Sequence, residues 1–504
     1  MIEENDKLEN DTFFDIHLHT FDLSHPSFSA FLKRFQLFPG SLLQKAIVTG
    51  TASLSMIVIV AGIIFVAFML FTFLIFKWPF IVSVAVSLGT WLALIFILIF
   101  CFRPQMTKIM KKFLDTTTNL LSVFENDIGS FFLIIENCLR EERDPVNKNK
   151  KREPHLKEDG LHIGNNTYKR VVLTPLMMDF GQKGKVLNPN CHYGEPSEKP
   201  IMGQVADVFN AINRYTQSVN TLPGGDPVSL KYTFLKQGTK RLFEVFPFLG
   251  INTQNYSFDK IQKMLNRYFN ENYRGSRSDL QKNIGKFDGH IENMGANSFA
   301  GIKVYPPLGF DPWPSAETEE GRKELEKVKW LYEFCEKRGI PITSHGGSSG
   351  FVGIEDENKL MDCTRISRWE TVLEHYKLLK LNIAHFPAEY ETRLASIKAD
   401  YKKESQRLYS VINLIKEYAN VYTDISCRAS NKEYYTHLKN VLENSKNDRG
   451  KLTSRILFGS DYAVVIGSID SYYDYIRLFS QTKDLTDIEK HAFCCINPQS
   501  FLFR

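Results

Sequence analysis

The chain has 504 residues, of which 43% are hydrophobic, and its formal net charge is +5. This length is enough for one large domain or two ordinary ones. Lysine and arginine nearly balance aspartate and glutamate, and no basic block is interleaved with aromatic residues, so the composition does not favour a nucleic-acid partner. Eight cysteines without C-x-x-C spacing argue against a zinc ribbon or a disulfide framework and favour a reducing compartment.

A short acidic leader, residues 1–10, lacks the apolar core of a secretory signal. After it, residues 13–20 read FFDIHLHT and are predicted to form a β-strand. Strand side chains alternate between two sides, so Asp15, His17 and His19 are expected on one side and the two apolar residues between them on the other. Two imidazoles on one side of a strand can hold one metal ion, but a hydrogen-bonded surface strand has the same pattern.

Two long uncharged stretches follow, residues 46–76 and 78–102, and only Lys77 separates them. Each stretch exceeds the roughly 20 residues that a helix needs to cross a bilayer. Two buried core helices are the alternative, but soluble helices of this length are rarely apolar on every side. The sequence therefore predicts a transmembrane helical hairpin.

Basic residues flank this hairpin on both sides. They are Lys33, Arg34 and Lys45 before it and Arg103, Lys108, Lys111 and Lys112 after it. Because short cytoplasmic segments carry an excess of lysine and arginine, we expect an integral membrane protein with two spans and with both termini in the cytoplasm. Helical spacing then predicts one long helix or two in tandem over residues 106–140, and residues 140–159 are predicted to be a solvated, charged linker.

From residue 160 onwards, short apolar strands alternate with helices. The predicted strands are KRVVLTPLMMDF (169–180), RLFEVFPFLGINT (241–253), AGIKVYP (300–306), IPITSHGG (340–347), LNIAHFP (381–387), NVYTDIS (420–426) and RILFGSDYA (455–463). The predicted helices are 204–219, 317–338, 369–380, 401–418 and 433–444. This alternation predicts a parallel sheet with crossover helices.

Four of these strands carry a polar residue near their carboxyl ends. The four residues are Lys303, His345, His385 and Asp461. The carboxyl ends of parallel barrel strands meet on one face of the molecule, so we expect these side chains to lie beside His17 and His19.

The ordered set of H-x-H, lysine, histidine, histidine and aspartate resembles the amidohydrolase superfamily, the metal-dependent (β/α)8-barrel hydrolases. The sequences of these segments are most similar to the amidohydrolase-2 branch, which includes decarboxylases. The resemblance covers about residues 11–25 and 160–504 and implies an α/β TIM barrel with the transmembrane hairpin inserted between strands one and two. It divides the chain into a first strand with its lead to the membrane (11–45), the hairpin (46–102), a juxtamembrane helix with a charged linker (103–159) and the remainder of the barrel (160–504), which we expect in the cytoplasm.

The resemblance also implies one or two catalytic divalent ions. Their ligands would come from His17, His19, His345, His385, Asp461 and Lys303. Imidazole and carboxylate ligands without a thiolate suit zinc, and also manganese, iron or nickel. In the family the strand-eight aspartate takes the proton from the metal-activated water, and Asp461 matches it. The strand-six histidine, which His385 matches, binds the metal or the substrate. Lys303 would either bridge two ions after carbamylation or act as a cation in the pocket.

The same strand-end reasoning predicts that Asp179, Tyr305 and Arg428 bind substrate. Arg428 could bind a carboxylate or phosphate through its forked guanidinium, or it could be an ordinary surface arginine. The resemblance implies a metal-dependent hydrolase that acts on a C–N or C–O bond of an amide, lactone or ester, and the predicted hairpin would anchor it in a membrane. A metal-dependent decarboxylase on the same scaffold and a membrane-tethered module that binds a ligand without turnover remain open. The expected partners are a small-molecule substrate and the membrane, with an oligomer left open.

Overall fold

The computed structural model of the chain describes residues 10–22, 24–26, 128–140, 151–181, 200–217, 242–354, 356–387 and 397–503. The chain divides into two compact units, Met1–Ala30 with Leu120–Arg504 and Phe31–Asn119, and all of the described residues belong to the first. The predicted transmembrane hairpin, 46–102, lies outside the described residues, as does the predicted helix up to residue 127. Within the described ranges, no helix combines the length and the apolar character needed to cross a membrane.

Two parallel sheets lie at the centre of this unit. The first has the order β1-β5-β6, with β1 (Thr12–Leu18), β5 (Arg170–Pro175) and β6 (Phe243–Val245). The second has the order β12-β11-β10-β9-β8-β7, with β7 (Phe248–Gly250), β8 (Gly301–Val304), β9 (Ile342–Ser344), β10 (Leu381–Ile383), β11 (Val421–Asp424) and β12 (Ile456–Leu457). Every pairing in both sheets is parallel, and the predicted α/β fold is confirmed.

Backbone hydrogen bonds join the two sheets. The predicted third strand is broken into β6 and β7 at Phe246 and Pro247, because a proline has no N–H to donate to a neighbouring strand. Leu176, just after β5, forms a parallel bridge with Phe248 of β7. On the other side, Phe458 and Tyr462, which follow β12, accept hydrogen bonds from backbone N–H groups of the β1 segment at 3.2 and 2.6 Å. β1 is therefore hydrogen-bonded to both sheets.

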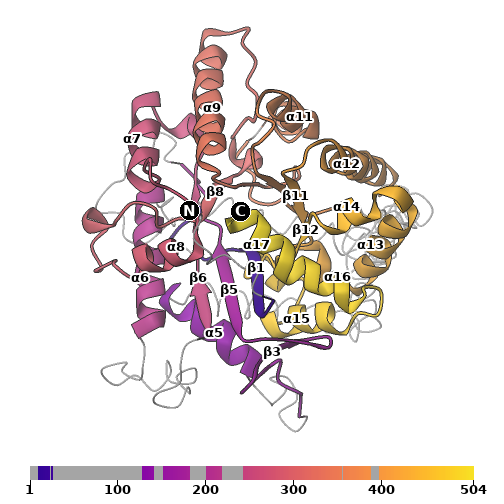
Figure 1. The fold of residues 1–504 in the computed structure, drawn as a ribbon. Helices are drawn as coiled ribbons and strands as arrows, with labels where there is room; N and C mark the ends of the chain where they lie inside the picture. The colour runs from indigo at the N-terminus through magenta and orange to yellow at the C-terminus, as the bar shows by residue number, and fades with distance from the viewer. Residues whose placement is uncertain are drawn as a thin grey trace, which may run out of the picture. The chain divides into compact units, whose positions relative to one another are not determined.

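Helices lie around the outside of these strands (Figure 1). They are α5 (Ile128–Arg140), α6 (Ile201–Gln217), α7 (Phe258–Tyr268), α8 (Arg277–Ile284), α9 (Glu319–Arg338), α10 (Glu357–Cys363), α11 (Ile366–His375), α12 (Ile397–Glu417), α13 (Lys432–Asn444), α14 (Arg449–Thr453), α15 (Tyr472–Gln481), α16 (Asp487–His491) and α17 (Asn497–Phe503). The start and end of α9 follow from local chemistry: the Thr318 hydroxyl accepts the Gly321 N–H, and Gly339 ends the helix in the left-handed conformation. The predicted helix 369–380 begins and ends earlier, as α11.

A small antiparallel sheet precedes β5. It consists of β2 (Leu156–Lys157), β3 (Gly160–Ile163) and β4 (Asn166–Tyr168). Its first strand lies within residues 140–159, so the prediction of a solvated linker is wrong for the end of that segment. The many charged residues there favoured a linker in the prediction, but Leu156 is buried and belongs to β2.

One hydrophobic cluster ties the strands to the C-terminal helix. Its buried members are Phe14, Ile16, Val172, Leu176, Phe246, Phe248, Leu280, Ala300, Tyr422, Leu457, Phe501 and Leu502. Phe501 and Leu502 belong to α17, which lies beside the strands in Figure 1. Burying side chains of this size contributes about 1.5–3 kcal/mol each, so α17 holds strands from both sheets together.

Candidate metal centre

Four of the predicted site residues converge at the carboxyl ends of the strands. His17, His385 and Asp461 each offer one ligand atom, and these three atoms lie within 4.8 Å of one another. His19 adds a fourth group: its Nε2 is 3.2 Å from Oδ1 of Asp461, while Nε2 of His17 is 3.6 Å from the same oxygen. All four side chains are buried. The structure therefore brings together the start and the end of the predicted ligand series.

The hydrogen bonds of His17 and His19 fix where their protons lie. Nδ1 of His17 donates to Oδ2 of Asp424, and Nδ1 of His19 donates to the Leu176 carbonyl, both at 2.9 Å. Both acceptors lack a proton of their own, so each of these hydrogen bonds needs a proton on Nδ1, and a ring that carries this single proton has its lone pair on Nε2. Burial lowers the pKa of His19 by more than Asp461 raises it, which favours the neutral ring.

With the protons on Nδ1, two Nε2 lone pairs would face the carboxylate of Asp461, and a cation between them would relieve the repulsion. Nε2 of His17 is buried and has no hydrogen-bond partner among the described residues. A divalent ion would satisfy both imidazoles and the carboxylate at once. The donor set of nitrogen and oxygen atoms without sulfur suits zinc with an open coordination position, and also manganese, iron or nickel. The residues present therefore fit a metal.

His345 lies beside this group and not within it. Its Nδ1 is 3.1 Å from Nε2 of His385, and its own Nε2 is buried without a partner among the described residues. Burial lowers the pKa of His385 to about 3 and the pKa of His345 well below its usual value, so both rings are neutral. His345, the predicted strand-five ligand, therefore contacts His385 but does not belong to the three-residue group.

The backbone at two of these residues is strained. His385 has a φ of 63° and Asp461 a φ of 58°, in the left-handed region where non-glycine residues cost of order 1 kcal/mol or more. Hydrogen bonds hold both residues there: the Asp461 N–H donates to the His17 carbonyl at 2.6 Å, and the His385 N–H donates to Asp424 at 3.1 Å. At Gly459 a Cβ would come within 2.6 Å of the Cβ of His17, so only glycine leaves room for that ligand.

Asp424, at the end of β11, is a site residue that sequence reasoning missed. Its carboxylate accepts hydrogen bonds from the ring of His17 and from the side chain of Asn382 at 2.7 Å, and Ser426 also donates to it. Burial raises the pKa of Asp424, but its neighbours, among them His17 and Ser426, together lower it by more, and the carboxyl stays ionised. A carboxylate behind a metal-binding histidine fixes its tautomer and increases its basicity. The signal in the sequence was an acidic residue near the end of the predicted strand NVYTDIS.

Asp15, which the sequence predicts on the same side as His17 and His19, is hydrogen-bonded to the segment that carries Asp461. The pairing of β1 has an irregularity in register between Asp15 and Leu18, which interrupts the simple alternation. The Asp15 carboxylate instead accepts hydrogen bonds from the Ser460 N–H at 2.9 Å and from the Tyr472 hydroxyl of α15 at 3.0 Å. Burial raises its pKa to about 7. Asp15 thus ties β1 to the segment that carries Asp461.

Lys303, at the third position of β8, is buried, and its Nζ has no hydrogen-bond partner among the described residues. Burial lowers its pKa to about 8, although the charges of Asp424 and Asp461 act in the opposite direction. An amine with a pKa of about 8 is partly neutral near physiological pH. Both expected roles, a carbamylated bridge and a cation in the pocket, remain compatible with this position.

The three predicted substrate-binding residues occupy different surroundings. Tyr305 stacks on His345, with ring centroids 4.3 Å apart and an interplanar angle of 22°. Arg428 begins the short helix η6 (Arg428–Ser430), two residues beyond Ser426, and is half-buried. Of the three, Tyr305 is the one that stacks on His345, the histidine next to His385.

The carboxylate of Asp179 is hydrogen-bonded to neighbouring groups of the protein. It accepts hydrogen bonds from the Gly181 N–H at 3.1 Å, the Asn252 N–H at 2.9 Å and the Asn255 amide at 3.0 Å. Burial raises its pKa to about 6. Asp179 lines a cavity of about 350 Å³ whose wall includes Lys260 of α7. Its hydrogen bonds fix the loop after β5.

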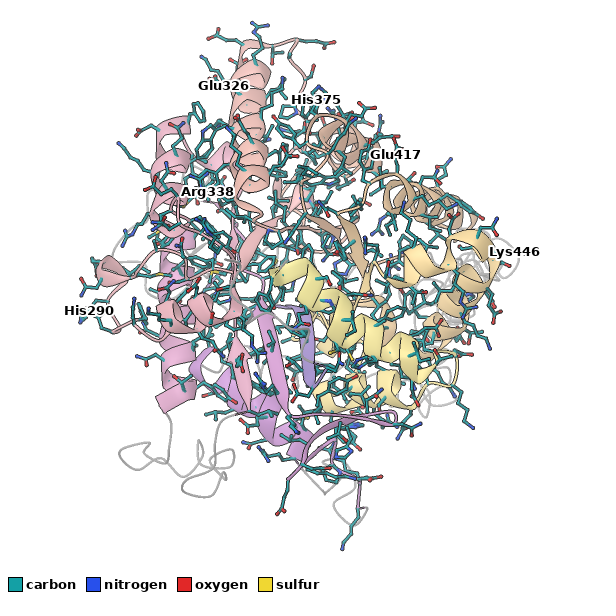
Figure 2. The ribbon with its side chains drawn as sticks, viewed as in Figure 1. His290, Glu326, Arg338, His375, Glu417 and Lys446 are labelled. Atoms are coloured by element: carbon teal, nitrogen blue, oxygen red, sulfur yellow. The ribbon has the colours of Figure 1, made fainter. Side chains whose placement is uncertain are left out.

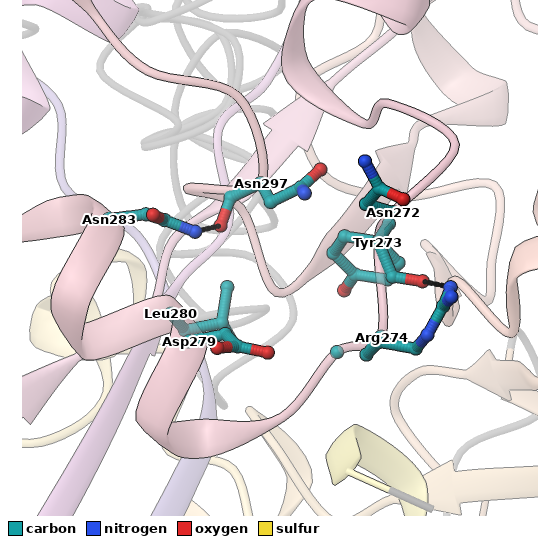
Figure 3. A pocket seen from close by; sticks show the side chains of 8 residues that line it. Asn272, Tyr273, Arg274, Asp279, Leu280, Asn283 and Asn297 are labelled. Atoms are coloured by element: carbon teal, nitrogen blue, oxygen red, sulfur yellow. Dashed lines mark hydrogen bonds between the residues drawn. The ribbon is translucent and has the colours of Figure 1, made fainter.

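Other polar features lie apart from the cluster. A cavity of about 200 Å³, which none of the predicted site residues lines, is shown in Figure 3. There the Asn283 amide donates to the Asn297 carbonyl at 3.3 Å. Among the remaining histidines, His290 and His375 are exposed and lie at the edge of the molecule in Figure 2. These two histidines are therefore suitable controls for the buried ones.

Residues 288–504 match a family model described as amidohydrolase. This part of the chain, less than half of its length, contains Lys303, His345, His385 and Asp461. No curated protein matches the sequence.

Three solved structures are similar to the chain at low TM-scores. A probable 2-pyrone-4,6-dicarboxylic acid hydrolase from Acinetobacter baumannii with bound citric acid has 13% identity and a TM-score of 0.31, over 67% of this chain and 84% of that one. A 5-carboxyvanillate decarboxylase from Novosphingobium aromaticivorans, complexed with manganese and a nitrobenzoic acid, has 10% identity and a TM-score of 0.33, over 67% and 76%. An amidohydrolase from Burkholderia multivorans with bound zinc has 11% identity and a TM-score of 0.28, over 52% and 83%.

Proposed function

We propose that the chain is a metal-dependent hydrolase that acts on a C–N or C–O bond of an amide, lactone or ester. The observation that carries this proposal is the buried group of His17, His385 and Asp461, whose ligand atoms lie within 4.8 Å of one another. The lone pairs of His17 and His19 facing Asp461 support a divalent ion there, with zinc as our first choice. The amidohydrolase match of residues 288–504 supports the same reaction class.

A bound divalent ion would supply Lewis acidity and would activate water for attack on the substrate carbonyl. Asp461 would accept the proton of that water and later pass it to the leaving group. The pKa of the Asp461 carboxyl lies well below its usual value in spite of its burial, so the group is ionised and able to accept a proton. Neutral His385 would donate a hydrogen bond to the substrate or bind the ion. Its ring is oriented by the Ser426 hydroxyl at 2.9 Å.

We propose further that the strands close into a (β/α)8 barrel. The hydrogen bonds between β1 and the segment after β12 support closure on one side, and the bridge from Leu176 to Phe248 supports it on the other. In such barrels the loops after the strands build the active site. The polar residues at the carboxyl ends agree with this arrangement.

Decarboxylation is the second candidate, and Lys303 is the observation that favours it. A buried ammonium without a hydrogen-bond partner among the described residues could pair with a substrate carboxylate beside the metal. Release of carbon dioxide from an aromatic acid, without consumption of water, would identify this reaction. A metal-loaded protein that turns over neither class of compound would favour the ligand-binding module.

The test of the metal site uses full-length protein purified in detergent. We expect at least one divalent ion per chain, and we expect the double variant His17→Ala/His19→Ala to lose it, because two of the ligands are gone. The matched control replaces two exposed histidines, His290→Ala/His375→Ala, and should keep the ion. Unchanged metal in the first double variant would reject the proposed site. A screen of amides, lactones, esters and aromatic acids would then define the reaction.

We also propose that residues 46–102 anchor the enzyme in a membrane, with both termini and the catalytic part in the cytoplasm. The support is the pair of uncharged stretches and the basic residues outside them. Full-length protein should stay with membranes through alkaline extraction, and replacing residues 46–102 by a polar linker should release it. Extraction of the unaltered chain by alkali would contradict the anchor without affecting the metal proposal.

A further inference from the structure

Arg407, on α12, donates hydrogen bonds to the backbone at the end of β10. Its Nη2 donates to the carbonyl oxygens of Ala384 and His385, both at 2.9 Å. These two carbonyls belong to the peptides on either side of the Cα of His385, which is a member of the metal-compatible group. A guanidinium is planar and permanently charged, so it can hold neighbouring acceptors with little loss of freedom.

The same guanidinium lies against the two glycines that follow His345. A Cβ on Gly346 would come within 2.6 Å of Nη2 of Arg407 and within 2.1 Å of the Ala384 carbonyl oxygen. A Cβ on Gly347 would lie 3.5 Å from Nη1. Gly346 therefore leaves the space in which Arg407 reaches the backbone at the end of β10.

His385 needs such a support because its backbone is left-handed, with a φ of 63°. Its N–H donates to the side chain of Asp424 at 3.1 Å, and its carbonyl accepts from Arg407. Both backbone polar groups of this residue are thus held by side chains from other elements. Without the guanidinium, two carbonyls would lose a charged donor and His385 would be free to return to a less strained conformation.

We propose that Arg407 is a positioning residue, which acts through the backbone of His385 to hold that imidazole in the metal-binding arrangement. This inference rests on the proposed metal function, but the two hydrogen bonds from Arg407 to the backbone are present in the metal-free chain. It adds a residue outside the strand-end series to the determinants of the site. It also gives Gly346 a role, because a Cβ at that position would overlap the guanidinium of Arg407.

The experiment compares Arg407→Met and Arg407→Lys with the control Arg322→Met in full-length protein. Arg322 is exposed on α9, and its Nη1 likewise points at two consecutive carbonyls, those of Ala316 at 3.0 Å and Glu317 at 3.5 Å. Zinc affinity is measured by competition with a chelator, and the visible spectrum of the Co²⁺-loaded protein reports the geometry of coordination.

We expect Arg407→Met to weaken zinc binding about tenfold to a hundredfold, the range found when supporting residues behind metal ligands are removed, and to alter the Co²⁺ spectrum. Arg407→Lys keeps the charge and can reach one carbonyl, so it should recover part of the affinity. Arg322→Met should match the unaltered protein. If Arg407→Met does not fold, the lysine variant is compared with the same control.

A second measurement needs no metal. Hydrogen exchange of the metal-free protein is followed in peptides that cover residues 381–387, where the N–H groups of His385 and Phe386 are bonded to Asp424. These amides should exchange faster in Arg407→Met and at the original rate in Arg322→Met. Unchanged exchange together with unchanged zinc affinity would overturn the proposal, as would equal losses in both methionine variants. An unaltered protein that binds no metal would reject the proposed function, while the exchange data would still decide whether Arg407 holds His385.

Discussion

Replacing Lys303 by methionine should stabilise the metal-free protein at neutral pH. Lys303 is buried, and its Nζ has no hydrogen-bond partner among the described residues. Keeping an ammonium there costs free energy that an apolar side chain of similar length does not. Because Lys303 is a candidate metal ligand and a candidate for carbamylation, the measurement applies to protein freed of metal and handled without carbon dioxide.

The magnitude follows from the depressed pKa. Burial lowers the pKa of Lys303 from 10.5 to about 8. At 1.36 kcal/mol per pKa unit, the folded state loses about 3 kcal/mol at pH 7 relative to a neutral side chain. Between pH 8 and 10.5 the unfolded chain binds the proton more tightly than the folded one, so stability rises with pH across this window. Above 10.5 the group is neutral in both states and the loss disappears.

Urea unfolding at pH 7 and at pH 10.5 measures this difference. Other groups titrate over the same range in both proteins, and subtracting the two curves isolates Lys303. We expect Lys303→Met to be more stable by about 3 kcal/mol at pH 7, with an advantage that shrinks towards pH 10.5. Lys323→Met, at an exposed lysine of α9, controls for the loss of a charge. A Lys303→Met protein that is no more stable than the unaltered chain at pH 7 would show that Asp424 and Asp461 compensate the buried ammonium.

Three further substitutions test the remaining assignments. Asp461→Asn should keep the fold but reduce turnover by orders of magnitude, because an amide cannot accept the proton; kcat near the original value would assign the base elsewhere. Asp424→Asn should weaken zinc binding about tenfold to a hundredfold in a chelator competition, since the amide cannot hold Nδ1–H of His17 in the same way. For Lys303→Ala, metal analysis should give the same single ion per chain as the unaltered protein. Two ions in the unaltered protein and one in the variant would establish the carbamylated bridge.

Much of the fold could be predicted from the sequence because its signals are local. Parallel strands buried on both faces appear as short apolar runs, and the helices between them have clear ends, as Thr318 and Gly339 show for α9. Because parallel strands end on the same edge, a ligand set spread from His17 to Asp461 could be identified as one site before its geometry was known. The break at Pro247 was also visible in the sequence but was passed over within a longer apolar run.

The details that support the ligands could not be predicted in the same way. A left-handed backbone conformation is expected of glycine, and the sequence gives no sign of it at His385 or Asp461. Long-range hydrogen bonds hold these residues in that conformation. Arg407 lies in the middle of α12, where an arginine usually faces solvent, and its acceptors come from a different strand. Asp424 carried a signal, an acidic residue in an apolar strand, but its partner His17 is more than 400 positions away in the sequence.

This distance also determines what a metal ion would do for the fold. His17 lies in β1 and Asp461 follows β12, and the backbone bond from the Asp461 N–H to the His17 carbonyl joins the two segments at 2.6 Å. An ion bound by both side chains would reinforce the same junction and offset the cost of the left-handed residues. A ligand at a thousand times its Kd stabilises the state that binds it by about 4 kcal/mol. The ion would supply this stabilisation at the place where Nε2 of His17 is buried without a hydrogen-bond partner among the described residues.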